Sequence, residues 1–62
     1  MTYDLDPLLR LPKVLEATGI SRAALYKKMN EGTFPPAVRL GPKSVAWRQS
    51  DVSRWIAELV EA

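Results

Sequence analysis

Two short helical segments, each ended by a glycine, constrain the fold of this chain most strongly. In LPKVLEATG the apolar side chains recur every three or four residues, which is the spacing of a buried helical stripe. Pro12 suits the first turn of that helix, where its missing N–H costs nothing, and Gly19 supplies the left-handed residue that commonly ends a helix. Ser21 is a good N-cap for the following segment RAALYKKMNE, which Gly32 ends. Two helices joined by a glycine-led turn of about three residues form the helix-turn-helix pattern.

The next part of the chain predicts a β-hairpin. TFPPAV cannot be helical, because each proline lacks a donor and disfavours helix in the residue before it. AVRL, GPKS and VAWR are then predicted to form a strand, a four-residue turn and a second strand. Strict alternation assigns one face to Val38, Leu40, Val45 and Trp47, and the other face to Arg39, Ala46 and Arg48.

A third helix is predicted after the hairpin. Ser50 is expected to cap it, with Asp51 in its first turn, where a negative charge suits the helix dipole. The strongest periodic signal of the chain follows, at Val52, Trp55, Ile56, Leu59 and Val60. Residues 1–7 are predicted to be a flexible N-terminal arm and residues 8–62 a single domain, which begins with a brief extended segment at 8–10. The predicted fold is mainly α with a small β-hairpin wing: a winged helix-turn-helix with three helices.

Composition argues against several classes of function. The chain has no Cys and no His, which removes disulfides, thiolate sites, the usual ligand of zinc, copper and iron, and the commonest general base. Since no phosphate loop is present either, we expect no enzyme, no cofactor, no metal and no small-molecule substrate. No segment approaches the roughly 18 apolar residues of a membrane span, and MTYDLDP lacks the regions of a signal peptide. We therefore expect a cytoplasmic protein without membrane contacts.

Positive charge is concentrated in the middle of the chain. Residues 20–48 hold six basic side chains against Glu31 alone, a net charge of +5, whereas the whole chain carries +2. The six are Arg22, Lys27, Lys28, Arg39, Lys43 and Arg48. Such a distribution is typical of a surface that binds a polyanion such as nucleic acid.

The helix at 22–31 carries its polar side chains opposite its core face. At 100° per residue, with Leu25 at the centre of the core face, the opposite face holds Ala23, Tyr26, Lys27 and Asn30. Arg22 lies in the first turn, where a positive charge opposes the helix dipole, and a ligand with many negative charges would reverse that cost. On double-stranded DNA, Arg22 is the best candidate for a bidentate contact to guanine.

The predicted hairpin offers a second basic surface beside this helix. Its outer face is expected to carry Arg39 and Arg48, and its tip Lys43. In such an arrangement the helix enters the major groove, while the wing touches phosphates or enters the minor groove. Trp47 and Trp55 fall on core faces, and we expect both to pack rather than to stack on bases.

The runs LLRLPKV, TGISRAALY, GTFPPAVRLGP and VAWRQSDV…RWI resemble the AlpA-type regulators of prophages, which belong with the small excisionases in the MerR-like winged-helix superfamily. The resemblance covers roughly residues 8 to 59. It implies a winged helix-turn-helix that binds DNA in a prophage or mobile element, as a transcriptional regulator, as a directionality factor for excision by an integrase, or as both. The DNA contacts of the family then fall on Ser21, Arg22, Tyr26 and Lys27, and its Gly-Pro-basic wing tip on residues 41–43.

Two functional interpretations follow from these observations. The first is a sequence-specific regulator of a prophage or mobile element, bound to double-stranded DNA in the nucleoid as a dimer or a cooperative array. The second is an adaptor for an integrase or RNA polymerase, whose basic face meets an acidic partner and makes only non-specific DNA contacts. Ala23 and Ala24 occupy positions where the family often has a hydroxyl residue, so possible hydrogen bonds to bases are missing here. Binding that ignores both sequence and salt would favour the adaptor.

Overall fold

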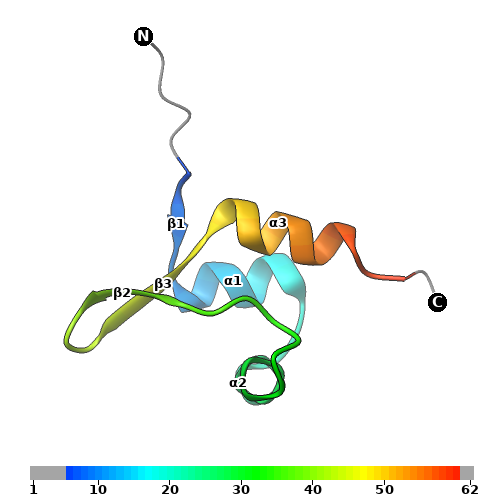
Figure 1. The fold of residues 1–62 in the computed structure, drawn as a ribbon, viewed down its shortest axis with the longest axis horizontal. Coiled ribbons are helices and arrows are strands. Elements are labelled where there is room, and N and C mark those ends of the chain that lie inside the picture. Colours follow the sequence, from blue (N-terminus) through cyan, green and yellow to red (C-terminus); the bar gives the residue numbers. More distant parts are fainter. Residues whose placement is uncertain (1–5, 61–62) are drawn as a thin grey trace, which may run out of the picture.

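Residues 6–60 form three helices and a three-stranded antiparallel sheet, in the order that the sequence predicts (Figure 1). This computed structural model describes residues 6–60, so most of the predicted arm at 1–7 lies outside the described residues. The elements are β1 (Leu8–Leu9), α1 (Leu11–Thr18), α2 (Arg22–Glu31), β2 (Val38–Gly41), β3 (Ser44–Arg48) and α3 (Gln49–Ala57). A helix-turn-helix followed by a β-hairpin and a third helix is a winged helix-turn-helix, and the predicted fold class is confirmed.

The turn between α1 and α2 is built by the residues that the sequence indicates. Gly19 adopts a φ of 75° and donates its N–H back to α1 at 2.8 Å, and Gly32 ends α2 with a φ of 77°. A side chain at either position would be strained, because L-residues rarely adopt positive φ. Ser21 caps α2, since its Oγ accepts a hydrogen bond from the N–H of Ala24 at 3.1 Å. Ile20 packs partly buried against the core, so the turn fixes α2 to the rest of the fold.

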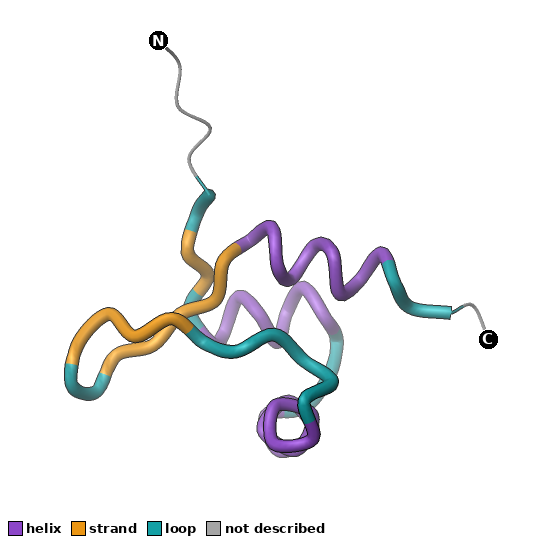
Figure 2. Tube along the Cα trace, in the orientation of Figure 1, coloured by secondary structure: helices purple, strands orange, loops and turns teal. Residues whose placement is uncertain are grey.

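The sheet has β3 at its centre, between β1 and β2, and the hairpin of β2 and β3 extends away from the helices (Figure 2). Val38 pairs with Ala46, and Arg39 pairs with Val45. Directly opposed residues in an antiparallel pair share a face of the sheet. The predicted faces of the hairpin are therefore wrong: Val45 lies on the side of Arg39, and Ala46 lies on the side of Val38.

One extra residue in β2 causes this difference. Gly41 pairs with Ser44 at the turn, and in a regular hairpin Leu40 would come next, opposite Val45, but the register shifts there by one residue. Leu40 thus forms a β-bulge, and a shift of one residue exchanges the two faces. Two-residue hairpin turns favour a positive φ, which Pro42 cannot adopt, and among residues 6–60 only the two glycines that end helices have one. The bulge lies directly beside this unfavourable turn.

α3 begins and ends earlier than predicted. It covers Gln49–Ala57, so Ser50 lies inside the first turn and is not the N-cap. The capping acceptor is Asp6, whose carboxylate accepts hydrogen bonds from the N–H of Ser50 at 3.0 Å and from its hydroxyl at 2.6 Å. Leu59 and Val60, which were expected to extend the apolar stripe, lie beyond the helix and are 54% and 94% exposed. The stripe that reaches the core is therefore shorter than predicted.

The core receives one buried side chain from each helix, one from the loop after α2 and one from the central strand β3. Its buried members are Val14, Leu25, Phe34, Trp47 and Val52. They come in turn from α1, α2, the loop after α2, β3 and α3, so all of these segments are anchored to one centre. Burial of large apolar side chains is the main favourable term in holding such a small domain together. Trp47 is fully buried, which confirms its predicted packing role.

Candidate nucleic-acid interface

The exposed face of α2 carries the side chains that the helical period assigns to it. Leu25 is fully buried beneath the helix, whereas the opposite face is exposed. This face consists of Ala23, Tyr26, Lys27 and Asn30. Tyr26 is 44% exposed, so a large part of its surface is free to contact a ligand. The small side chain at position 23 also lets a bulky ligand approach the helix backbone closely.

The N-terminal end of α2 combines a hydroxyl donor with positive charge. Ser21 uses its Oγ to accept from the N–H of Ala24. A hydroxyl has one donor and two acceptor positions, so this cap leaves the O–H of Ser21 able to donate to a phosphate oxygen. Arg22 is the first residue of α2 and is exposed, and the first turn holds no acidic residue. Free backbone N–H groups and the helix dipole favour an anion at the same place.

The wing carries two basic side chains near its tip. Lys43 is exposed in the turn between β2 and β3, and Arg39 is exposed on β2. Nη1 of Arg39 donates a hydrogen bond to the carbonyl of Pro42 at 3.4 Å. This bond directs the guanidinium toward the tip, so both charges lie at the end of the wing that projects from the fold.

Arg48 lies at the other end of β3 and in a different environment. It lies five positions after Lys43, about 16 Å along an extended strand. Alternation along β3 places it on the face opposite Val45, so it does not share a face with Arg39 as predicted. Hydrogen bonds from Ser50 hold the pKa of Asp6 below its usual range, and the nearby charge of Arg48 lowers the same pKa further. Arg48 therefore lies at the base of the wing, beside the start of α3.

Within residues 6–60 the basic side chains of α2 and the wing form no ion pair with a carboxylate. Among residues 6–60 one salt bridge forms, between Lys13 and Glu16 at 3.8 Å on α1. None of the six basic residues between positions 20 and 48 has a carboxylate oxygen within 4.0 Å in this part of the chain. Within residues 6–60 these charges have no direct ion-pair partner, although Asp6 lies close enough to Arg48 for the two charges to interact. The balance of charge over α2 and the tip of the wing is therefore positive in this part of the chain.

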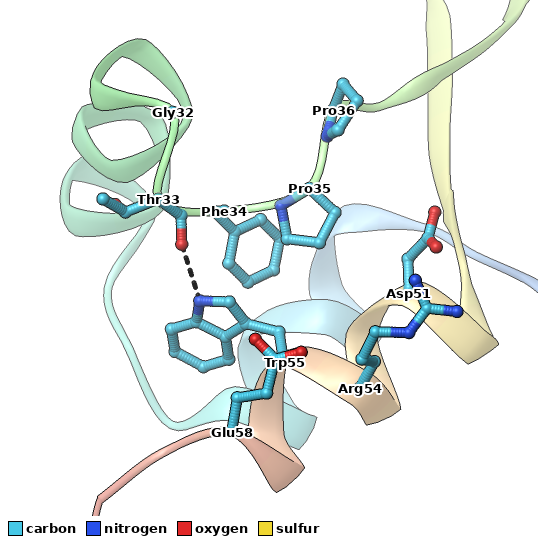
Figure 3. Close-up of a pocket in the computed structure, with 9 residues that line it drawn as sticks. All are labelled: Gly32, Thr33, Phe34, Pro35, Pro36, Asp51, Arg54, Trp55 and Glu58. Carbon is cyan, nitrogen blue, oxygen red and sulfur yellow. Dashed lines mark hydrogen bonds between the residues drawn. The ribbon is translucent and has the colours of Figure 1, made fainter.

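Aromatic packing fixes the connection between α2 and the wing (Figure 3). Nε1–H of Trp55 on α3 donates to the carbonyl of Thr33 at 2.8 Å. The rings of Phe34 and Trp55 lie 4.9 Å apart between centroids, at an angle of 60°. Pro35 and Pro36 follow and line a pocket between this connection and α3, and their fixed φ angles stiffen the chain. The wing is thus held in a defined position relative to α2.

Sequence reasoning misses two exposed apolar residues of the wing and one residue that supports its base. Leu40 and Val45 are 47% and 37% exposed, although regular alternation assigns both to the core face with Trp47. A signal for this was present, because Pro42 in a two-residue turn disfavours the regular register. Asp6, which caps α3, carries no local signal, since its partner lies 44 residues away.

Neither a metal-binding cluster nor a membrane-spanning helix is found in the described part of the chain. Residues 6–60 hold no group of three or more acidic side chains placed to bind a metal ion. No helix in this range is long and apolar enough to cross a bilayer. The chemistry that the α2 face and the wing offer is that of hydrogen-bond donors and positive charge.

Comparisons with known proteins relate the chain to prophage regulators. A family model described as "Prophage CP4-57 regulatory protein (AlpA)" matches residues 7–60. The DNA-binding transcriptional activator AlpA of Escherichia coli strain K12 is 37% identical over 57 residues, which cover 82% of this chain and 81% of that protein. The uncharacterized protein ORF88 of Enterobacteria phage P4 is 47% identical over 52 residues, which cover 84% of this chain and 59% of that protein. No solved structure matches the chain.

Proposed function

Because the chain belongs to the family of the prophage CP4-57 regulatory protein AlpA, we propose that it is a DNA-binding transcriptional regulator. It binds double-stranded DNA with the exposed face of α2 and with the wing. The activity named for the Escherichia coli relative supports this assignment. The proposal extends to a prophage or mobile-element context through the same family and through the phage P4 relative.

The concentration of basic side chains on α2 and the wing, without an ion pair among residues 6–60, is the observation that carries this proposal. Six basic residues in these elements lack a carboxylate partner within residues 6–60, while Lys13 on α1 has one. A protein gains nothing in stability from holding so many like charges on neighbouring elements, because they repel one another. A polyanion reverses that repulsion and releases counterions when it binds, which gives an affinity that depends strongly on salt.

In the proposed complex α2 lies in the major groove, the groove in which all four base pairs can be distinguished. Arg22 reaches base edges as a bidentate donor to guanine, and Ser21 donates its free O–H to a phosphate. The remaining α2 contacts, to phosphates or base edges, come from Ala23, Tyr26, Lys27 and Asn30. Leu25, on the opposite side of the helix, fixes its orientation through the core.

The wing makes the second contact, on the backbone or in the minor groove. Arg39 and Lys43 lie near its tip and reach phosphates on either side of a groove. Arg48 contacts the backbone closer to the body of the protein, where it also supports the start of α3. Since the Thr33–Trp55 hydrogen bond fixes the connection, α2 and wing approach DNA as one preformed unit.

We propose that the protein acts in transcription control, as a directionality factor for excision, or as both. One domain of this size covers a short DNA site, so we propose that it binds as a dimer or as a cooperative array. Contacts with an integrase or RNA polymerase would connect DNA binding to excision or to transcription.

A selection of binding sites from random duplex DNA tests the proposal. Affinities of enriched and rejected sequences are then measured at two salt concentrations. The proposal predicts a defined motif with a steep salt dependence, and the spacing of motif copies gives the arrangement of protomers. Weak binding without any enriched motif would contradict sequence-specific regulation and favour the adaptor for an integrase or polymerase.

A further inference from the structure

The wing exposes apolar side chains next to its basic ones. Leu40 is 47% exposed and Val45 is 37% exposed, on neighbouring strands close to the turn. At a β-bulge two residues of one strand oppose a single residue of the other, so Arg39 and Leu40 both lie opposite Val45. Single exposed apolar residues are common on protein surfaces, but here two lie on the hairpin that extends away from the helices (Figure 2).

The charge around this pair indicates what covers it. Residues 32–50 contain no Asp or Glu and hold Arg39, Lys43 and Arg48. In the described part of the chain none of the three has a carboxylate within 4.0 Å. An apolar pair flanked by Arg39 and Lys43 suits a partner that is polyanionic outside and apolar inside. Duplex DNA has this structure, because phosphates line the groove and stacked bases form its interior.

We propose that Leu40, supported by Val45, enters the minor groove and inserts between base pairs, so that the protein bends its DNA site. The inference rests on the proposed DNA-binding function and names what the wing does there. Arg39 and Lys43 then contact phosphates on both sides of the inserted leucine. Apolar side chains of this kind kink duplexes in other minor-groove proteins by partly unstacking one base step.

The architecture of the wing supports insertion. β2 is an edge strand, while its partner β3 is anchored by Ala46 and Trp47, which are both fully buried. Bulges are known to redirect a side chain next to a binding site, and this one lies at Leu40 itself. The hydrogen bond from Arg39 to Pro42 braces the chain on both sides of the bulge. Leu40 therefore lies on a strand whose position is fixed. A side chain that separates stacked bases needs such a rigid support.

Bending of a duplex with one selected site, measured by energy transfer between dyes at its two ends, tests this inference. Leu40→Ala should lose at least half of the bend angle. It should also bind about tenfold more weakly, because the complex no longer buries a leucine side chain. Leu40→Met keeps the bulk and should retain the bend. The matched control is Leu59→Ala, the same substitution at a similarly exposed leucine beyond α3, which should change neither quantity.

Several results would overturn the inference, and they differ from failure of the proposed function. Specific binding without a bend, or an unchanged bend in Leu40→Ala, would show that the leucine does not insert. An effect of Leu40→Ala that appears only on duplexes with two adjacent sites would assign the side chain to a contact between protein copies. If the wild-type protein binds no selected site, the proposed function fails and the inference fails with it.

Discussion

Asp6 caps the N-terminus of α3 through Ser50, a residue 44 positions further along the chain. The carboxylate accepts from the hydroxyl of Ser50 at 2.6 Å and from its N–H at 3.0 Å, and the carbonyl of Pro7 accepts from the N–H of Gln49 at 2.8 Å. The segment before β1 is thereby attached to the junction of β3 and α3. These contacts support the base of the wing, although neither Asp6 nor Ser50 belongs to the predicted DNA-binding surfaces of α2 and the wing.

The Asp6 cap predicts a pH dependence of stability. The hydrogen bonds from Ser50 lower the pKa of Asp6 in the folded protein. A carboxyl group with a lowered folded pKa stabilises the fold above its unfolded pKa of about 3.9, and this contribution is lost as pH falls through the folded value. We expect the free energy of unfolding to be higher for wild type than for Asp6→Asn at neutral pH, and the two values to converge in acid.

Denaturant unfolding of both proteins between neutral and acidic pH checks this expectation. Comparison with Asp6→Asn isolates this group, because the other carboxyl groups titrate in both proteins. Ser50→Ala is the matched partner variant and should return the pKa of Asp6, followed by NMR, toward its ordinary value. A stability difference that stays constant with pH would show that the cap does not depend on the charge of Asp6.

Trp55→Phe should destabilise the fold by about 1–2 kcal/mol. The substitution keeps an aromatic ring beside Phe34 but removes the donor to the carbonyl of Thr33, and one such hydrogen bond contributes about 1 kcal/mol. Chemical denaturation gives the free energy of unfolding. Tyr26→Phe, which removes a polar group from an exposed ring, serves as control and should stay within about 0.5 kcal/mol of wild type. A fully stable Trp55→Phe would mean that the bond does not fix the connection to the wing.

Arg22→Ala should relax sequence preference at about one base pair. A bidentate contact to guanine discriminates by roughly 1–3 kcal/mol, so the variant should lose this discrimination and keep its preferences elsewhere in the site. Affinities for the selected site and for its single-base variants provide the measurement. If Arg22→Ala discriminates as wild type does, the proposed orientation of α2 is incorrect.

Lys43→Ala should weaken binding to all sequences about equally. A phosphate contact carries no sequence information, and its loss reduces the slope of log affinity against log salt by roughly one unit. Lys13→Ala removes the same charge from α1, where Lys13 pairs with Glu16, and should leave the slope unchanged. Equal slopes for Lys43→Ala and wild type would remove the wing tip from the interface.

The features that the sequence predicts correctly are those with local causes. Gly19 and Gly32 end their helices because each supplies a positive φ, and Ser21 caps the helix that immediately follows it. The exposed face of α2 also follows from its period, since Leu25 fixes which side is buried. A short window of sequence contains all of the information that these features need.

The features that sequence reasoning misses depend on contacts between residues far apart in the chain, or on how the turn sets the register of the hairpin. The sequence predicts Ser50 as the N-cap of α3, because it gives no local sign that Asp6 supplies the acceptor. In the hairpin, an unfavourable turn at Pro42 leads to a bulge at Leu40 and exchanges the faces of β2 relative to β3. That no carboxylate among residues 6–60 lies within 4.0 Å of Arg39, Lys43 or Arg48 likewise becomes visible only in the folded arrangement.

The central claim is that the exposed face of α2 and the wing together bind DNA. An NMR titration of the labelled protein with its selected duplex tests it most directly. We predict that amide shifts change along residues 21–30 and 39–48, while the amides of residues 53–57 on α3 move little. Large changes confined to α3 and the pocket beside Trp55, with α2 unperturbed, would contradict the claim.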